Sequence, residues 1–290
     1  MFEGFATQDV ATNGNHIFVR TAGAGEPLLL LHGYPQTGAM WHAVAPALAE
    51  QFTVVVPDLR GYGRSGKPAG GGDSSAYSKR TMAAEMVEVM RALGHTRFGV
   101  AGHDRGGRVA YRLAFDHPDV VTKLAILDIV PTYHMWQRME SRLGGLGGYH
   151  WYFLAQPEPL PEKLIAADPI YFLHNCLERW AGKGFQYAPE AMAEYERSFS
   201  DPGTIHGSCE DYRAGARIDV EIDTADYGVR KIRQPMLALW GGARGNRDDL
   251  PIWREWADDA RGKALDCGHF LPEEDPKATT EALRDFFSGQ

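Results

Sequence analysis

The feature that most constrains the fold of this chain is a short apolar run that turns sharply into a helix. Residues Arg97–Ala101 have the length and composition of a buried strand, and Gly107–Phe115 has a helical periodicity that Pro118 ends. The connecting turn, Gly102–Gly106, is short and rich in glycine. Similar strand and helix patterns alternate along much of the chain. This alternation predicts a mostly parallel sheet with helices on both faces.

The predicted elements define a core and an insertion. Strands are predicted at His16–Arg20, Pro27–Leu31, Phe52–Val56, Leu124–Ile129 and Met236–Trp240, and helices at Trp41–Gln51, Lys79–Leu93, Pro189–Ser198 and Pro276–Phe287. Between about residues 131 and 230 the alternation stops, and the sequence is rich in Trp, Tyr, His and Met without a clear buried strand. We therefore predict an α/β core formed by residues 1–130 and 231–290, with a helical cap formed by residues 131–230.

Composition argues against several classes of function. The net charge of −8 disfavours nucleic acid as a partner, because phosphate binding needs a basic face, but it allows an anionic substrate held by a few buried arginines. The first residues lack the pattern of a signal peptide, and no apolar run reaches the roughly 18–20 residues of a membrane span. Three scattered cysteines do not suggest a disulfide framework. We expect a cytoplasmic enzyme without a metal or another cofactor.

A glycine-rich segment raises the alternative of a nucleotide site. Residues Gly61–Gly66 match the pattern G-x-G-x-x-G after a strand, and Lys67 lies where a P-loop has its lysine. Pro68 then occupies the position of the metal-binding hydroxyl, and together with the following glycines it prevents a helix from starting there. We therefore interpret the segment as a tight turn after Asp58.

The turn Gly102–Gly106 has the spacing of a nucleophile elbow, G-x-S-x-G, with Asp104 in place of serine. The ordinary role of an aspartate at this position is to cap a helix. Two other segments favour catalysis. The backbone N–H of Tyr34, after an earlier strand, is placed to form an oxyanion hole with that of Arg105. His269 lies past the last predicted strand, where the chain order of such sites has its base.

Two arginines follow the candidate nucleophile. Cations in the first turn of a helix are unfavourable, because the helix N-terminus already carries partial positive charge, so two of them indicate a function. Arg105 and Arg108 lie three residues apart on one helix face, and guanidinium groups bind carboxylates through paired donors. We predict that both bind a substrate carboxylate and keep Asp104 ionised. The alternative for Arg108 is an ion pair with a surface acid.

Several motifs together resemble the branch of the α/β-hydrolases that uses an aspartate nucleophile, and within it the fluoroacetate dehalogenases. The motifs are His32–Thr37, Gly102–Arg108, Leu127–Ile129, Tyr149–Trp151, Cys209–Gly215 and Gly268–Glu274. Most of them are specific only to the branch, whereas the Asp-Arg-x-x-Arg element with the His-Trp pair of the cap is narrower. The resemblance implies an α/β-hydrolase fold with a helical cap, hydrolysis of a small haloacid without a cofactor, and a homodimer.

The resemblance also implies an acid partner for the histidine. It places this role on Asp128, which ends the strand after the elbow helix. Asp248 or Asp249, after the next strand, is the alternative placement. Both residues follow the segment Gly241–Arg247, which has no clear sequence pattern, so we favour Asp128.

The cap carries the residues that resemble halide-binding donors. These are His150, Trp151 and Tyr212, whose imidazole, indole N–H and phenol O–H are suitable neutral donors. Trp180 is expected to line the same pocket. Packing inside the cap is the ordinary alternative for all of these rings.

The implied reaction explains why aspartate replaces serine. The Asp104 carboxylate displaces halide from the α-carbon and forms an ester, which water activated by His269 hydrolyses. Serine would form a stable ether with no carbonyl for water to attack. One alternative is an epoxide hydrolase that uses cap tyrosines such as Tyr152 and Tyr212, although a neutral epoxide does not need a second arginine. The other is a non-catalytic protein of the same fold that binds a ligand.

Overall fold

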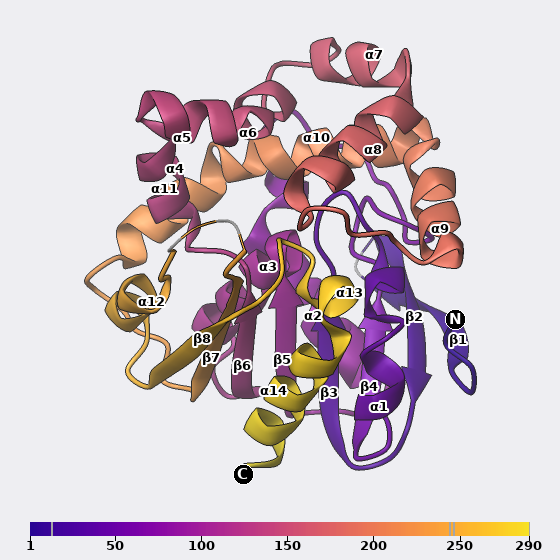
Figure 1. Ribbon diagram of the computed structural model, residues 1–290, viewed down its shortest axis with the longest axis vertical. Coiled ribbons are helices and arrows are strands. Elements are labelled where there is room, and N and C mark those ends of the chain that lie inside the picture. The colour runs from indigo at the N-terminus through magenta and orange to yellow at the C-terminus, as the bar shows by residue number, and fades with distance from the viewer. Residues whose placement is uncertain (13, 244, 246, 290) are drawn as a thin grey trace.

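The computed structural model describes residues 1–12, 14–243, 245 and 247–289, and its centre is an eight-stranded sheet (Figure 1). The strands are β1 (Ala6–Thr12), β2 (Asn15–Ala22), β3 (Glu26–Leu31), β4 (Phe52–Pro57), β5 (Phe98–His103), β6 (Val121–Leu127), β7 (Met236–Gly241) and β8 (Ala260–Leu265). They lie in the order β1-β2-β4-β3-β5-β6-β7-β8. The first two strands pair antiparallel to their neighbours, and the strands from β4 to β8 are parallel.

The central strands read as continuous apolar runs because helices cover both of their faces. Leu28–Leu31 of β3 and Val54–Val56 of β4 are fully buried. The two edge strands lack this signal, and the sequence did not predict them. Strand β8 carries Arg261 and Lys263 and is largely exposed, as is common for the edge of a sheet.

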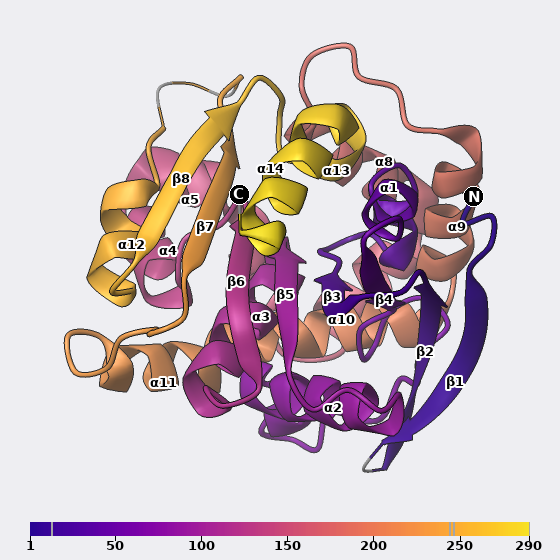
Figure 2. The same ribbon diagram turned by 90° about the horizontal axis from the view of Figure 1, so that it is seen from below.

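The core helices flank the sheet. They are α1 (Ala45–Leu48), α2 (Lys79–Ala92), α3 (Asp104–Asp116), α12 (Leu250–Trp256), α13 (Leu271–Glu274) and α14 (Pro276–Ser288). Helices α1 and α14 cover one face, and α2 and α3 cover the other (Figure 2). The prediction of one helix over Trp41–Gln51 is wrong: the structure has a 3₁₀ turn, η1 (Gly38–Trp41), followed by α1. Pro46 lacks an N–H, so it starts a helix more readily than it continues one.

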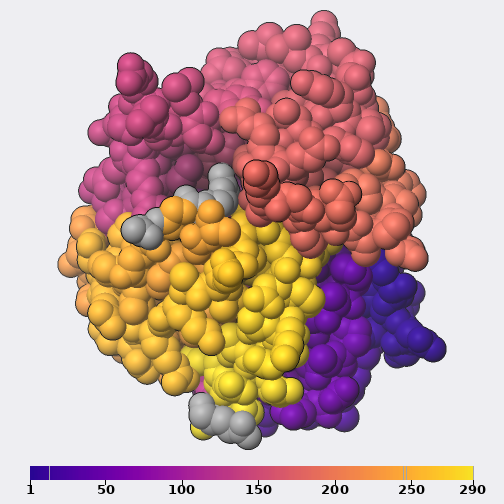
Figure 3. Space-filling view, viewed as in Figure 1, coloured from indigo at the N-terminus to yellow at the C-terminus, as the bar shows by residue number. Residues whose placement is uncertain are grey.

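Helices from α4 to α11 fill the chain between β6 and β7. They are α4 (Thr132–Met139), α5 (Arg142–Gly147), α6 (Tyr149–Leu154), α7 (Leu160–Ala166), α8 (Pro169–Trp180), α9 (Pro189–Phe199), α10 (Pro202–Gly215) and α11 (Ile218–Asp226). This insertion forms a cap over the carboxyl ends of the parallel strands (Figures 1 and 3). Helix α5 buries none of its residues. The site described below lies between the cap and the core.

The glycine-rich segment after β4 is a turn, as the sequence predicts. Gly63 has φ +53°, and a Cβ on it would lie 2.1 Å from Oδ2 of Asp58, so the turn closes tightly around that carboxylate. The next element is the short 3₁₀ turn η2 (Ser75–Tyr77), and a phosphate-binding helix does not follow. Within the described part of the chain, no helix combines the length and hydropathy needed to cross a membrane.

Candidate active site

Asp104 stands at the sharp turn between β5 and α3. Its backbone has φ +46°, in the left-handed region that aspartate tolerates better than most residues. The neighbouring loop after β3 lies so close that a Cβ on Gly33 would come within 2.5 Å of Cβ of Asp104. The Asp104 side chain lines a cavity of about 520 Å³ between core and cap.

A backbone N–H group contacts the Asp104 carboxylate. The N–H of Tyr34 donates to Oδ1 of Asp104 over 2.9 Å. The N–H of Arg105 lies in the first turn of α3, where helix N–H groups have no partner within the helix. Burial would raise the pKa of Asp104, but the charges of His269 and the nearby arginines outweigh it and lower that pKa. The nucleophile candidate is therefore a carboxylate at neutral pH.

His269 joins the two carboxylates that the sequence singled out. Its Nδ1 lies 2.5 Å from Oδ2 of Asp128, and its Nε2 lies 4.0 Å from Oδ2 of Asp104. Nε2 of His103, the residue before Asp104, lies 2.8 Å from the backbone carbonyl oxygen of His269. Burial lowers the pKa of His103 to about 4. A neutral His103 can thus donate to this carbonyl and hold the histidine loop against the elbow.

Asp128, rather than Asp248 or Asp249, lies beside the histidine. Its Oδ1 accepts from the N–H of Gly241 at 2.9 Å and from Arg247 Nη2 at 2.8 Å. Burial would raise the pKa of Asp128, but the hydrogen bond with His269 and the charge of Arg247 keep it well below its usual range.

The two alternative acids face elsewhere. Asp249 forms ion pairs with Arg138, at 3.0 Å, and with Arg247. Asp248 accepts from the backbone N–H of Leu250 at 3.0 Å. Within the described part of the chain, neither carboxylate lies within hydrogen-bond distance of His269.

Arg105 is completely buried and already has an acidic partner. Its Nε and Nη2 bind the two carboxylate oxygens of Asp211, on α10, at 3.0 and 2.6 Å. Lys79 and the hydroxyl of Tyr62 contact the same carboxylate. The Arg105 guanidinium also packs 4.2 Å from the ring centre of Tyr212. Nη1 of Arg105 is buried without a hydrogen-bond partner among the described residues.

Arg108 lines the cavity and has only neutral partners. Its Nη1 donates to the carbonyl of Val130 and to Oγ1 of Thr132, each at 3.1 Å. No acidic side chain lies within ion-pair distance of it in the described residues, so it does not pair with a surface acid. Its Nε has no partner there either, and the Trp151 ring centre is 4.6 Å from the guanidinium carbon. The side chain is almost fully buried.

Aromatic residues of the cap close the cavity from above. His150, Trp151 and Trp180 line it, and the ring centres of His150 and Trp180 are 4.6 Å apart. Tyr212 is buried behind them, 5.3 Å from the ring of Trp151, and is not among the lining residues. Burial lowers the pKa of His150 to about 3, so its imidazole is neutral. Tyr152, by contrast, is exposed and donates to the carbonyl of Met139 at 3.2 Å.

The structure adds residues that the sequence analysis missed. Asp211 and Thr132 hold the two arginines, and Arg247 holds Asp128. Asp211 stands beside Tyr212 in the motif Cys209–Gly215, but no local pattern shows which residue Asp211 contacts. Another part of the cavity wall is formed by Met135, Met139 and three glycines of and after α5, which are Gly144, Gly147 and Gly148.

The chain is similar to known proteins over nearly its whole length. Residues 26–276 match the family described as alpha/beta hydrolase fold. A fluoroacetate dehalogenase from Burkholderia sp is 46% identical over 293 aligned positions, which cover 99% of this chain and 95% of that protein. A soluble epoxide hydrolase from Corynebacterium sp. (strain C12) is 39% identical, with 95% of each protein covered.

A solved structure from Nostoc sp PCC 7120, provisionally described as an alpha/beta hydrolase, is similar throughout. It is 51% identical, it has a TM-score of 0.97, and the alignment covers 100% of both chains. The likeness therefore includes the cap as well as the core.

Proposed function

We propose, from the premise that this chain belongs to the alpha/beta hydrolase family, that it hydrolyses the carbon–halogen bond of haloacetates such as fluoroacetate or chloroacetate. The observation that carries the proposal is Arg108, a buried guanidinium on the cavity wall whose partners are neutral, close to the Asp104 carboxylate. A buried cation without an acid partner favours an anionic ligand. The similarity to a fluoroacetate dehalogenase supports the same substrate class.

The first step forms an ester on Asp104. Oδ2 of Asp104 attacks the α-carbon of the haloacetate, a C–O bond forms, and the carbon–halogen bond breaks with its electron pair leaving on the halide. Arg108 holds the substrate carboxylate and offsets its repulsion by Asp104. Arg105 has one unpaired nitrogen, Nη1, for the same purpose, because Asp211 occupies Nε and Nη2.

The departing halide needs donors without a competing charge. His150 and Trp151 line the cavity opposite the elbow, and Tyr212 packs directly behind Trp151. Neutral imidazole N–H, indole N–H and phenol O–H groups stabilise an anion where it develops. We assign the halide site to these three residues, with Trp180 as a wall of the pocket.

The second step releases glycolate. His269, oriented by Asp128, takes a proton from water, and the resulting hydroxide attacks the carbonyl carbon of the Asp104 ester. The N–H of Tyr34 lies 2.9 Å from an Asp104 oxygen, which supports a role in stabilising the oxyanion. We assign the second donor of the oxyanion hole to the N–H of Arg105. Collapse of the oxyanion breaks the ester bond, and His269 gives its proton to the leaving glycolate oxygen. The other proton of the water leaves Asp104 for solvent, which restores the carboxylate.

Epoxide hydrolysis is the second candidate, and the Corynebacterium relative is the observation that favours it. That reaction would use Asp104 and His269 with cap tyrosines that activate the ring oxygen. Tyr152 is exposed, and its hydroxyl is bound to a backbone carbonyl. One assay separates the candidates: incubation with fluoroacetate, chloroacetate and styrene oxide, followed by measurement of halide and diol. Halide release supports the proposal, diol alone favours the second candidate, and neither product points to a non-catalytic protein.

The covalent step has its own test. A single turnover in ¹⁸O-labelled water should place the label in Asp104 before it appears in glycolate, and mass spectrometry of the peptide with Asp104 reports it. The variant His269→Asn should accumulate the ester as a mass increase on the same peptide. Label that enters only glycolate in the first turnover would exclude the Asp104 ester.

A further inference from the structure

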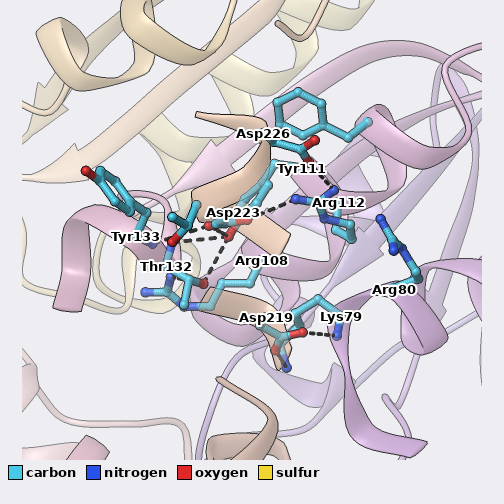
Figure 4. Close-up of polar contacts among 12 residues, drawn as sticks. Lys79, Arg80, Arg108, Tyr111, Arg112, Thr132, Tyr133, Asp219, Asp223 and Asp226 are labelled. Carbon is cyan, nitrogen blue, oxygen red and sulfur yellow. Dashed lines mark hydrogen bonds and ion pairs between the residues drawn. The ribbon is translucent and has the colours of Figure 1, made fainter. Parts of the chain in front are cut away.

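We propose that Thr132 is a positioning residue for Arg108: it fixes the guanidinium through a neutral hydrogen bond and leaves its positive charge available to the substrate carboxylate. The proposal rests on the function proposed above. The residues that carry it form a buried polar chain from Arg108 to helix α11 of the cap (Figure 4).

The contact with Arg108 is the first link. Oγ1 of Thr132 accepts from Nη1 of Arg108 at 3.1 Å, and the carbonyl of Val130 accepts from the same nitrogen at 3.1 Å. Both acceptors are uncharged, so they orient the guanidinium without neutralising it. Because they engage only one nitrogen, Nε remains without a partner among the described residues. Burial lowers the pKa of Arg108, which is the expected sign for a cation that lacks an acidic partner.

Donor and acceptor counting fixes the direction of the chain. Since an arginine can only donate, Thr132 Oγ1 accepts from Arg108. The Tyr111 hydroxyl lies 3.0 Å from Thr132 Oγ1 and gives its own hydrogen to a carboxylate, so the Thr132 hydroxyl donates to it. The Tyr111 hydroxyl in turn donates to Oδ2 of Asp223 at 2.7 Å. The other oxygen of Asp223 accepts from Arg112 Nη2 at 2.9 Å. The charge of the terminal carboxylate is therefore met by Arg112 and not by Arg108.

The position of Thr132 in the fold links this chain to the cap. Thr132 begins α4, where the polypeptide leaves the core sheet, and its side chain is fully buried. Its backbone N–H donates to the Tyr111 hydroxyl at 3.1 Å, and the N–H of Tyr133 donates to Oδ2 of Asp223 at 3.3 Å. Asp223 lies on α11, at the other end of the insertion. The first and last helices of the cap thus meet at the group that orients Arg108.

The decisive variant is Thr132→Val, which keeps the shape of the side chain and the backbone N–H but removes the hydroxyl. Arg108 binds the substrate carboxylate before and during the reaction, so its loss of orientation should raise KM and leave kcat nearly unchanged. We expect KM for chloroacetate to rise about tenfold and the Kd for acetate, measured by calorimetry, to rise by a similar factor, with kcat within about twofold. Thr132→Ser, which restores the hydroxyl, should return KM and Kd to near the wild-type values.

The matched control is Thr279→Val on α14. Thr279 is also fully buried, and its hydroxyl donates to the carbonyl of Leu271 at 2.9 Å, away from Arg108. The Thr279→Val variant should lose thermal stability in the same way as Thr132→Val, but it should keep the wild-type KM and the wild-type Kd for acetate. A merely structural role for the Thr132 hydroxyl predicts the same behaviour for both variants, and that result would overturn the proposal.

Two further measurements test the positioning role of Thr132 even if the Thr132→Val variant does not fold or the protein releases no halide. If Thr132→Val does not fold, Tyr111→Phe decides, because it removes the acceptor that turns the Thr132 hydroxyl: a rise in KM at unchanged kcat supports the chain, and an unchanged KM overturns it. Acetate binding requires no turnover. Wild-type protein that binds acetate but releases no halide would therefore contradict the proposed reaction, whereas the Kd of Thr132→Val would still test the positioning role.

Discussion

Arg105 and Arg108 lie three residues apart on one face of α3 and are both buried, yet their surroundings are opposite. Arg105 binds the carboxylate of Asp211 through two nitrogens, while Arg108 donates to a carbonyl and a hydroxyl. The Arg105 group continues to Lys79 and, at 3.5 Å, to Asp219, so two cations meet two acids there. Arg108 lines the cavity and forms no ion pair with an acid among the described residues.

This difference shows that a buried arginine has two separate uses. An arginine paired with a buried acid contributes mainly to the fixed geometry of the fold, and removing either partner leaves an uncompensated charge. An arginine with neutral partners retains its capacity to bind an anion. The Asp211 ion pair joins core helix α3 to cap helix α10, whereas the uncharged support of Arg108 leaves a place for substrate.

The largest expected effect is on stability. Arg105→Met leaves Asp211 buried with Lys79 as its remaining cation, and we expect the free energy of unfolding to fall by about 3 kcal/mol. Arg108→Met leaves only a carbonyl and a hydroxyl without their hydrogen-bond donor, and it should lower the free energy of unfolding by about 1 kcal/mol. Urea unfolding of both variants at pH 7 measures the difference. Equal losses would remove the distinction between the two arginines.

The next largest effect is expected on activity, and it concerns Arg108. Arg108→Met is expected to lower kcat/KM for chloroacetate at least about 100-fold, or roughly 2.7 kcal/mol, because the charge that holds the substrate is lost. Arg108→Lys keeps the charge but loses the paired-donor geometry, and a loss of at least about tenfold is expected. Halide release at subsaturating substrate gives both values. Full activity of Arg108→Lys would show that this residue does not clamp the carboxylate.

A smaller difference between the two arginines is expected in the dependence of the unfolding free energy on acid pH. Burial would raise the pKa of Asp211, but the charges of Arg105 and Lys79 hold it well below its usual range. The stability that this carboxylate contributes is therefore present above the pKa of an unfolded aspartate, about 3.9, and is lost as the pH falls toward the folded value. Asp211→Asn should flatten the fall in unfolding free energy between pH 4 and pH 2, and Arg108→Met should keep the wild-type slope. Urea titrations across that range test both expectations.

The smallest effect is expected for the pH dependence of halide binding at His150 in the cap. The pKa of His150 is lowered to about 3 by burial, so its ring is a neutral donor at every pH near neutrality. Inhibition by bromide should then change by less than about twofold between pH 6 and pH 8. A rise in bromide affinity of tenfold or more toward pH 6, measured as a competitive inhibition constant, would mean that the halide meets a cation instead.

The sequence predicts the elements that local patterns define. The elbow at Asp104 and the buried central strands follow from apolar runs and glycine spacing, and the position of His269 follows from chain order. Asp211 and Thr132 escape prediction because they act across 106 and 24 residues of sequence, on elements whose packing no local pattern describes. Edge strand β8 escapes because its alternation of Arg261, Lys263 and small residues looks like a loop.

One wall of the cavity consists of backbone rather than side chains, because helix α5 and the residues after it present Gly144, Gly147 and Gly148. A Cβ at Gly144 would lie 1.9 Å from the carbonyl oxygen of Arg138, but a Cβ at Gly147 would meet no atom within 4 Å. A side chain at residue 147 can therefore reduce the volume of the cavity without displacing a neighbouring residue. The size of the cavity is thus set at positions other than those of the groups around Asp104.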